Sequence, residues 1–289
     1  MVSSTGNRLI APQSVFTATA TNHISYRVAD YARMRDFYMD LLGMRCVYDD
    51  GTKCAVEFGS PARSLYIIES QAGADLPYVD HLAFSVADFD LESSKAALER
   101  WGFEPEYDGD HAWTIQDSEG FKVQICDEEG VFPGAARPDA TTEGRVPTGR
   151  AAERPGVFRA TAVNHVAYRV PDYARARDFY IDLLGMRVAF EDGLKCSVAF
   201  GDPEDALYIM PSGDAPAHVD HLAFSVADFD LDSGAAELRN QGHDPEDDGS
   251  YAWTIWDPEG YKIQICAETG VYPGARRDPY HNPASRGSR

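Results

Sequence analysis

The chain of 289 residues has little lysine, no closely spaced cysteine pair and no long apolar run. Only 5 of its 26 basic residues are lysine, and 47 acidic residues give a formal net charge of −21. Nucleic acids and anionic membranes require a basic footprint, so we expect neither as a partner. No apolar run approaches the roughly 20 residues that span a bilayer. We recognise no signal peptide, and we expect a cytoplasmic protein.

The five cysteines also exclude some classes. Their number is odd and there is no Cys-x-x-Cys motif, which predicts reduced, buried thiols and not a disulfide framework or a structural zinc site. The sequence lacks a nucleophile-elbow serine, a P-loop and a dinucleotide-binding glycine fingerprint. With 44% hydrophobic and 25% charged residues, the composition is that of an ordinary globular protein.

What the sequence does contain is a tandem duplication. NHISYRV at 22–28 returns as NHVAYRV at 164–170, and VDHLAFSVADFDL at 79–91 is identical to 219–231. Internal repetition of this length predicts two similar domains. We expect an N-terminal extension at 1–19, a first domain at 20–132, a linker at 133–157, a second domain at 158–274 and a flexible tail at 275–289.

A fainter repeat lies inside each copy. Four histidines occupy the frame Asx-His-x-x-aromatic-x-Val-x-Asp-aromatic, and each frame leads into a helical pattern followed by short β-like runs. The chain is therefore predicted to contain four strand–helix–strand–strand–strand (βαβββ) units, two in each domain. Their pairing is left open, because the units can pair consecutively within a copy or exchange between copies.

Strand alternation sorts each frame into two faces. In the first frame, Ile24, Tyr26 and Val28 share an apolar face that a helix must cover, while His23 and Arg27 share the opposite, open face. Imidazole nitrogens and a side-chain carbonyl are competent ligands for a first-row divalent metal. The histidines of the open faces and a glutamine on each closing strand are our candidate ligands: His23, His81 and Gln124 in the first copy, and His165, His221 and Gln264 in the second.

These frames, with the closing AWTIQDSEGFKVQIC at 112–126 and AWTIWDPEGYKIQIC at 252–266, resemble the vicinal oxygen chelate superfamily. It includes glyoxalase I, methylmalonyl-CoA epimerase, extradiol dioxygenases and bleomycin- or fosfomycin-resistance proteins. The resemblance implies an α+β fold in which paired βαβββ units form two cupped mixed β-sheet domains (the glyoxalase/bleomycin resistance/dioxygenase fold). It also implies one divalent metal per domain, bound against neighbouring oxygens of a small-molecule substrate.

The sequence departs from the family pattern at the third ligand. The family's closing glutamate falls on Gln124 and Gln264, and a fourth ligand of glyoxalase-like members falls on tyrosines (Tyr66 and Tyr208). Three protein ligands favour an oxygenase-like site, although the tyrosine of ring-cleaving members falls on threonines (Thr114 and Thr254).

We therefore expect an Fe(II)-dependent, extradiol-like dioxygenase, with Mn(II), Zn(II) or Ni(II) as other metals. The alternatives are a glyoxalase- or epimerase-like lyase or isomerase, and a metal-free binding or resistance protein for an antibiotic. Arg27 and Arg169 are candidate catalytic residues. Trp113, Trp253, Lys122 and Lys262 are candidate substrate-binding residues. The protein is expected to be a monomer or a homodimer.

Overall fold

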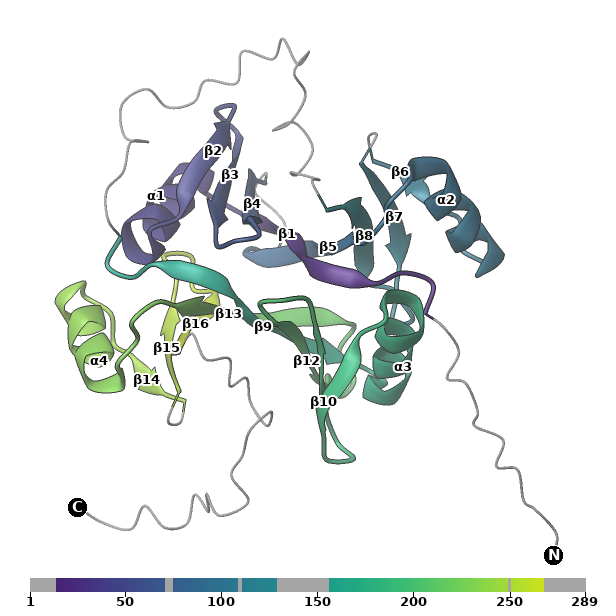
Figure 1. The fold of residues 1–289 in the computed structure, drawn as a ribbon. Helices are drawn as coiled ribbons and strands as arrows, with labels where there is room; N and C mark the ends of the chain where they lie inside the picture. Colours follow the sequence, from purple (N-terminus) through teal and green to yellow (C-terminus); the bar gives the residue numbers. More distant parts are fainter. Residues whose placement is uncertain (1–13, 71–74, 109–110, 129–155, 249–250, 268–289) are drawn as a thin grey trace, which may run out of the picture.

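The computed structural model describes residues 14–70, 75–108, 111–128, 156–248 and 251–267 (Figure 1). The predicted tail and most of the predicted extension and linker lie outside these residues, and the exact domain boundaries stay predictions. No described helix is long and apolar enough to cross a membrane.

Each copy of the repeat forms one eight-stranded mixed sheet. The first has the strand order β2-β3-β4-β1-β5-β8-β7-β6, and the second repeats it as β10-β11-β12-β9-β13-β16-β15-β14. The first copy comprises β1 (Ala18–Val28), α1 (Tyr31–Leu42), β2 (Arg45–Asp49), β3 (Lys53–Phe58), β4 (Arg63–Glu69), β5 (Tyr78–Val86), α2 (Leu91–Arg100), β6 (Glu106–Tyr107), β7 (Ala112–Gln116) and β8 (Lys122–Asp127). The second comprises β9 (Ala160–Val170), α3 (Tyr173–Leu184), β10 (Arg187–Glu191), β11 (Cys196–Phe200), β12 (Asp205–Pro211), β13 (His218–Val226), α4 (Leu231–Asn240), β14 (Glu246–Asp247), β15 (Ala252–Trp256) and β16 (Lys262–Ala267).

This order confirms the four βαβββ units and settles how they pair. The two units of a copy join where their first strands run antiparallel, β1 beside β5 and β9 beside β13. Pairing is therefore consecutive within each copy, so His23, His81 and Gln124 belong to one sheet.

Local signals in the sequence define the helix after each first strand. Asp30 caps α1 by accepting a hydrogen bond from the backbone N–H of Arg33, and Gly43 ends the helix in the left-handed conformation (φ 63°). Between these caps, Met34, Tyr38 and Leu42 turn inward and are buried. This apolar stripe holds α1 against the strands of its own unit.

The two copies pack back to back around a shared core. Phe58 lies 5.5 Å from Phe224 between ring centroids, and Phe84 lies 5.4 Å from Phe200. Figure 1 shows α1 beside α4 and α2 beside α3, so each half of the molecule mixes units from the two copies. The histidine-bearing face of each sheet is turned away from this core, and we call it the first or the second cup.

Polar contacts between the copies are largely reciprocal. Tyr168 donates a hydrogen bond of 2.6 Å to Asp117, and Tyr26 donates one of 2.6 Å to Asp257. A buried ion pair is not reciprocal: the guanidinium of Arg63 pairs with Asp205 at 2.9 Å, and each side chain is fully buried. Residues 63 and 205 occupy equivalent positions of the two copies, so here the copies had to differ in charge.

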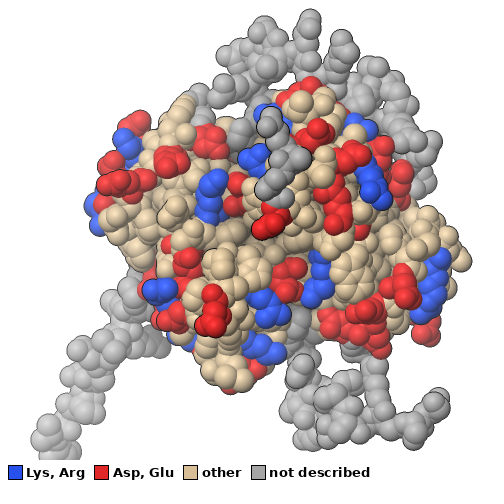
Figure 2. Space-filling model, turned by 180° about the vertical axis from the view of Figure 1, so that it is seen from behind, with Lys and Arg blue, Asp and Glu red and all other residues tan. Residues whose placement is uncertain are grey.

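The outer surface agrees with the acidic composition. Figure 2 shows aspartate and glutamate side chains spread over one whole face of the molecule, with fewer lysines and arginines between them. A continuous basic stripe of the kind that tracks a phosphate backbone is not seen on this face.

Candidate metal centre

The first cup is built around two histidines from the central strands. His23 on β1 and His81 on β5 face each other with their Nε2 atoms 3.1 Å apart. Both rings are nearly inaccessible to solvent. The strand registers place Ala83 opposite His23 and beside Gln124, which brings the glutamine of β8 to the same pair.

A β-bulge precedes each histidine. The register of β1 with β5 steps from Thr21 to His23, which makes Asn22 the extra residue, and it steps from Val79 to His81, which makes Asp80 the extra residue. A bulge lets two successive side chains reach one face of a sheet. Each histidine therefore lies beside the Asx residue that precedes it.

These Asx side chains fix how the imidazoles are protonated. Nδ1 of His81 lies 2.7 Å from Asp80, and Nδ1 of His23 lies 2.8 Å from Oδ1 of Asn22. The amide of Asn22 is oriented by its own donation to the Ser85 hydroxyl. Since both Asx oxygens are acceptors, the protons sit on the two Nδ1 atoms and leave the Nε2 lone pairs facing the cup.

Gln124 supplies a third electron-pair donor. Its amide nitrogen donates to Thr114 at 3.1 Å and also to Asp108. Its Oε1 atom is buried and has no hydrogen-bond partner among the described residues. The oxygen is therefore held free, while both amide hydrogens are used.

The second cup repeats this arrangement. The Nε2 atoms of His165 and His221 are 3.1 Å apart, and Gln264 again presents a buried, unpartnered Oε1. The flanking contacts also recur, from His165 to Asn164 (2.9 Å), from His221 to Asp220 (2.7 Å) and from Gln264 to Thr254 (3.2 Å) and Asp248.

Burial and neighbouring charges decide the protonation of the cups. Burial, helped by the nearby His81, lowers the pKa of His23 well below its usual value, and burial does the same for His165. The hydrogen bond from His81 holds the pKa of Asp80 well below its usual range, with help from Lys122. His23 and His165 are thus neutral near pH 7, and the Asp80 carboxylate is charged.

The donor set fits a divalent cation. Two Nε2 lone pairs at 3.1 Å repel unless a proton or a metal ion lies near both, and an unpartnered amide oxygen converges with them. Histidine ligands that donate Nδ1–H to an Asx oxygen are typical of metal sites. Within the described part of the chain, no three His, Cys, Asp or Glu side chains are grouped to hold a metal, so the glutamine must complete the set.

Next to the histidines of the first cup lies a cavity of about 470 Å³. This volume suits a small molecule. Its lining includes Arg27, Lys122 and Tyr66, so two of the predicted side chains with positive charge do reach the site. Lys122 pairs with Asp80 at 3.0 Å, whereas Nε of Arg27 lies 3.9 Å from Asp80 and makes no hydrogen bond within the described structure.

Comparison with known proteins agrees with this geometry. The model of the Glyoxalase/Bleomycin resistance protein/Dioxygenase superfamily matches residues 20–125 and 162–265. The chain belongs to this superfamily. No curated protein sequence matches it significantly.

Several solved structures share its fold at low sequence identity. An Mn(II)-bound glyoxalase from Novosphingobium aromaticivorans is 18% identical (TM-score 0.63; 88% of this chain and 83% of that one covered). Homoprotocatechuate 2,3-dioxygenase from Arthrobacter globiformis is also 18% identical (TM-score 0.63; 90% and 82% covered). A 2,3-dioxygenase from Pseudomonas sp. KL28 is 16% identical (TM-score 0.62; 89% and 95% covered).

Two of the predicted substrate-binding residues, Trp113 and Trp253, do not reach the cups. The indole N–H of Trp113 donates to the carbonyl of Leu91 at 2.8 Å, and Trp253 does the same to Leu231. On β7, Thr114 lies opposite Gln124, so the alternating Trp113 faces the core side. The tryptophans pack beneath α2 and α4, which does not agree with the substrate-binding role predicted for them.

In the second cup, the predicted basic residues are tied to a carboxylate. Nε of Arg169 bonds Asp220 at 2.8 Å, and Nζ of Lys262 lies 2.9 Å from the same group. Arg169 is thus held more firmly than Arg27. The role of either arginine stays a prediction.

The residues that support the ligands were not predicted from the sequence. Asp80 and Asn22 precede their histidines in the frame, but strict alternation would place them on the opposite face. Asp108 and Asp248 were not singled out at all. Their signal is that each stands 16 residues before the glutamine of its copy.

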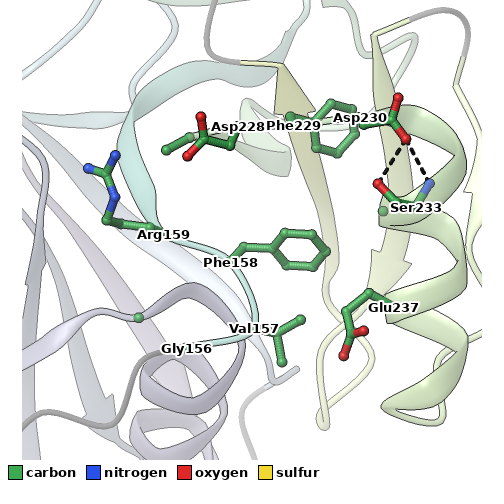
Figure 3. Close-up of a pocket in the computed structure, with 12 residues that line it drawn as sticks. Gly156, Val157, Phe158, Arg159, Asp228, Phe229, Asp230, Ser233 and Glu237 are labelled. Atoms are coloured by element: carbon green, nitrogen blue, oxygen red, sulfur yellow. Dashed lines mark hydrogen bonds between the residues drawn. The ribbon is translucent and has the colours of Figure 1, made fainter.

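A second cavity, of about 530 Å³, lies away from the cups (Figure 3). The cavity lies between two sides, with the end of α1 and the residues before β9 on one and the start of α4 on the other. Figure 3 shows Phe158 extending toward α4, where Asp230 accepts hydrogen bonds from Ser233. The Asp230 carboxylate caps the N-terminus of α4, and no histidine is among the described residues that line the cavity.

Proposed function

We propose that the protein is a metal-dependent oxygenase of the extradiol dioxygenase type, which acts on a small substrate with two adjacent oxygens. One observation carries the proposal: in each cup, two imidazole Nε2 atoms lie 3.1 Å apart, and the neighbouring strand presents an amide Oε1 that is buried and unpartnered among the described residues. Three ligands on one side of an ion leave positions open for substrate, as in oxygen-activating facial sites.

His23, His81 and Gln124 would hold the ion in the first cup, and their counterparts would hold it in the second. A divalent ion there, Fe(II) in our proposal, supplies Lewis-acid and redox chemistry to the substrate's neighbouring oxygens. The other tasks belong to the chain. Lys122 and Arg27 place positive charge beside the cavity, where a substrate that has lost its hydroxyl protons carries negative charge. Tyr66 also lines the cavity.

A second function is favoured by a specific feature. The third donor is a neutral amide, so the cup binds a cation less strongly than a cup with a carboxylate there. An anionic ligand held by Arg27 and Lys122 without any metal would make the protein a binding or resistance protein.

One experiment separates these functions. The purified protein is loaded without oxygen with Fe(II), Mn(II), Zn(II) or Ni(II), and oxygen consumption is then followed with a panel of catechols. We expect uptake with Fe(II) and a ring-opened product, and we expect the H81A/H221A variant to lose it. Metal binding without uptake would overturn the oxygenase in favour of a lyase or isomerase. Ligand binding unchanged by H81A and by metal removal would leave only the binding protein.

A further inference from the structure

Asp108 and Asp248 are charged residues of the cups that neither the family match nor the ligand pattern assigns. Each lies just after the short edge strand of its sheet, β6 or β14, and accepts a hydrogen bond from the amide nitrogen of the cup's glutamine. The same contact forms in both copies, although two nearby positions differ (Tyr107 against Asp247, and His111 against Tyr251). The contact is therefore a shared feature of the two cups.

The contact decides which end of the glutamine faces the histidines. A terminal amide can turn by half a rotation at little cost, which exchanges its oxygen and its nitrogen. In the first cup, both hydrogens of the amide are taken, by Asp108 and by the hydroxyl of Thr114. Turning the amide would press its oxygen against the Asp108 carboxylate. The oxygen of Gln124 is therefore fixed toward the imidazole pair.

The contact also supplies charge. Two neutral imidazoles and an amide leave a buried divalent ion without a negative ligand, which is costly. Asp80 is already offset by Lys122, whereas Asp108 forms no ion pair with any described residue. A carboxylate that accepts the amide N–H polarises the amide and raises the negative charge on its oxygen.

We infer that Asp108 and Asp248 are positioning residues that turn Gln124 and Gln264 into metal ligands. Each aspartate holds the amide oxygen toward the ion and provides, one hydrogen bond away, the negative charge that a carboxylate ligand would bring. This inference rests on the proposed function only in requiring that the cups bind a divalent metal.

The test measures Mn(II) affinity by the electron paramagnetic resonance signal of free Mn(II), with no turnover. The parent is H165A/H221A, which confines binding to the first cup. We expect D108A to weaken affinity about 10- to 100-fold, the usual range for residues that support metal ligands. D108N keeps an acceptor but loses the charge, so its loss should be smaller. E57Q, which removes a carboxylate from an exposed pair with Arg45, should bind as the parent does.

The decisive comparison places D108N in two backgrounds, the parent with Gln124 and a variant with a carboxylate there, Q124E. In the Q124E background, Asp108 faces a second carboxylate, and D108N removes this repulsion and donates a hydrogen bond to it. We therefore expect D108N to weaken binding in the parent but to strengthen it in the Q124E background. A residue that only stabilises the hairpin would weaken binding in both backgrounds.

The outcomes are distinct. If the parent binds Mn(II) and neither D108A nor D108N changes its affinity, or if D108N acts alike in both backgrounds, the inference is wrong and the metal site stands. If neither the wild type nor the parent binds Mn(II), Fe(II), Zn(II) or Ni(II), the proposed function falls, and the inference falls with it. Thermal melting of each variant shows that it is folded, and D248A in an H23A/H81A parent repeats the test in the second cup.

Discussion

The first and second cups are alike in their buried histidines and glutamine, and they differ in the residues around them. In each, the same Nε2 separation of 3.1 Å, the same bulged Asx residues and the same unpartnered amide oxygen recur. Above them, Arg27 is loosely held where Arg169 is bonded to a carboxylate, and His111 stands where the second copy has Tyr251. The comparison shows that both cups keep the same three donor side chains, while the contacts of the charged residues around them differ.

The copies also differ beneath the cups. Asp205 of the second copy accepts the backbone N–H of Thr21, just before the bulge of the first cup, and pairs there with Arg63. The buried pair thus supports the first cup from behind, and its two members occupy equivalent positions of the repeat. Two identical copies packed in this way would place side chains of the same charge against each other at this position.

The largest expected effect comes from this buried pair. R63A leaves Asp205 fully buried without its partner, and we expect a loss of about 3–5 kcal/mol in the free energy of unfolding, measured with urea. The exposed Arg45 pairs with Glu57, and R45A should cost about 1 kcal/mol or less. The exchange R63D/D205R should recover part of the loss. Equal costs for R63A and R45A would remove the asymmetry that we describe.

The next effect tests what the cups share. D80A removes the acceptor that orients His81, so Mn(II) affinity of the first cup should fall about 10- to 100-fold. D220A should cause the same loss in the second cup, because the contact to His221 has the same length. Isothermal titration with Mn(II) measures each in a background where the other cup lacks its histidines. Losses that differ by more than about tenfold would show that the cups are not equivalent.

A smaller effect tests how the cups differ. A catechol bound in the first cup should lose about tenfold in affinity on R27A, because the Arg27 guanidinium lines the cavity and has no hydrogen bond at Nε to give up. In the second cup, Asp220 already neutralises Arg169, so R169A should change affinity less. Equilibrium titration with 4-nitrocatechol in single-cup backgrounds compares the two. A larger loss for R169A would reverse the assignment.

The smallest effect concerns pH and the contacts between copies. Burial raises the pKa of Asp117 and of Asp257, so each binds a proton more readily in the folded chain. Their stabilising contribution is full below the ordinary pKa of about 3.9 and is lost as the pH rises through the raised value. The difference in unfolding free energy between wild type and D117N should therefore shrink as the pH rises from 4.

An exposed helix cap provides the opposite sign. Hydrogen bonds from Ser93 lower the pKa of Asp90, so its contribution is present above the ordinary pKa and is lost as the pH falls. The difference between wild type and D90N should therefore grow as the pH rises toward about 4 and should then level off. Urea unfolding at stepped pH measures both differences. Parallel slopes for D117N and D90N would contradict the account of the buried carboxylates.

Much of the fold could be predicted from the sequence, because its signals are local. The frame around each histidine contains a strand pattern, a capping aspartate and a helix stripe, and the four frames predicted the four units. Within the site, alternation predicted that His23 and Arg27 share the open face. The same rule applied to β7 would have turned Trp113 away from the cup, since Thr114 lies opposite Gln124.

The remaining features depend on contacts that no local pattern encodes. A bulge breaks the alternation that would otherwise place Asp80 on the opposite face, and only the pairing of β1 with β5 shows it. Asp108 follows β6, and its contact with Gln124 on β8 spans the intervening strand β7. The meeting of Arg63 and Asp205 depends on how two whole domains pack, at a separation of 142 residues.

The metal content of the loaded protein tests the central claim most directly. Wild type, H23A/H81A, H165A/H221A and the variant lacking all four histidines are loaded with Mn(II), passed through a desalting column and measured by inductively coupled plasma mass spectrometry. We predict one ion per cup in the wild type, loss of one ion in either double variant and loss of both when all four histidines are replaced. A wild type without bound metal, or a fourfold variant that keeps its ions, would contradict the account.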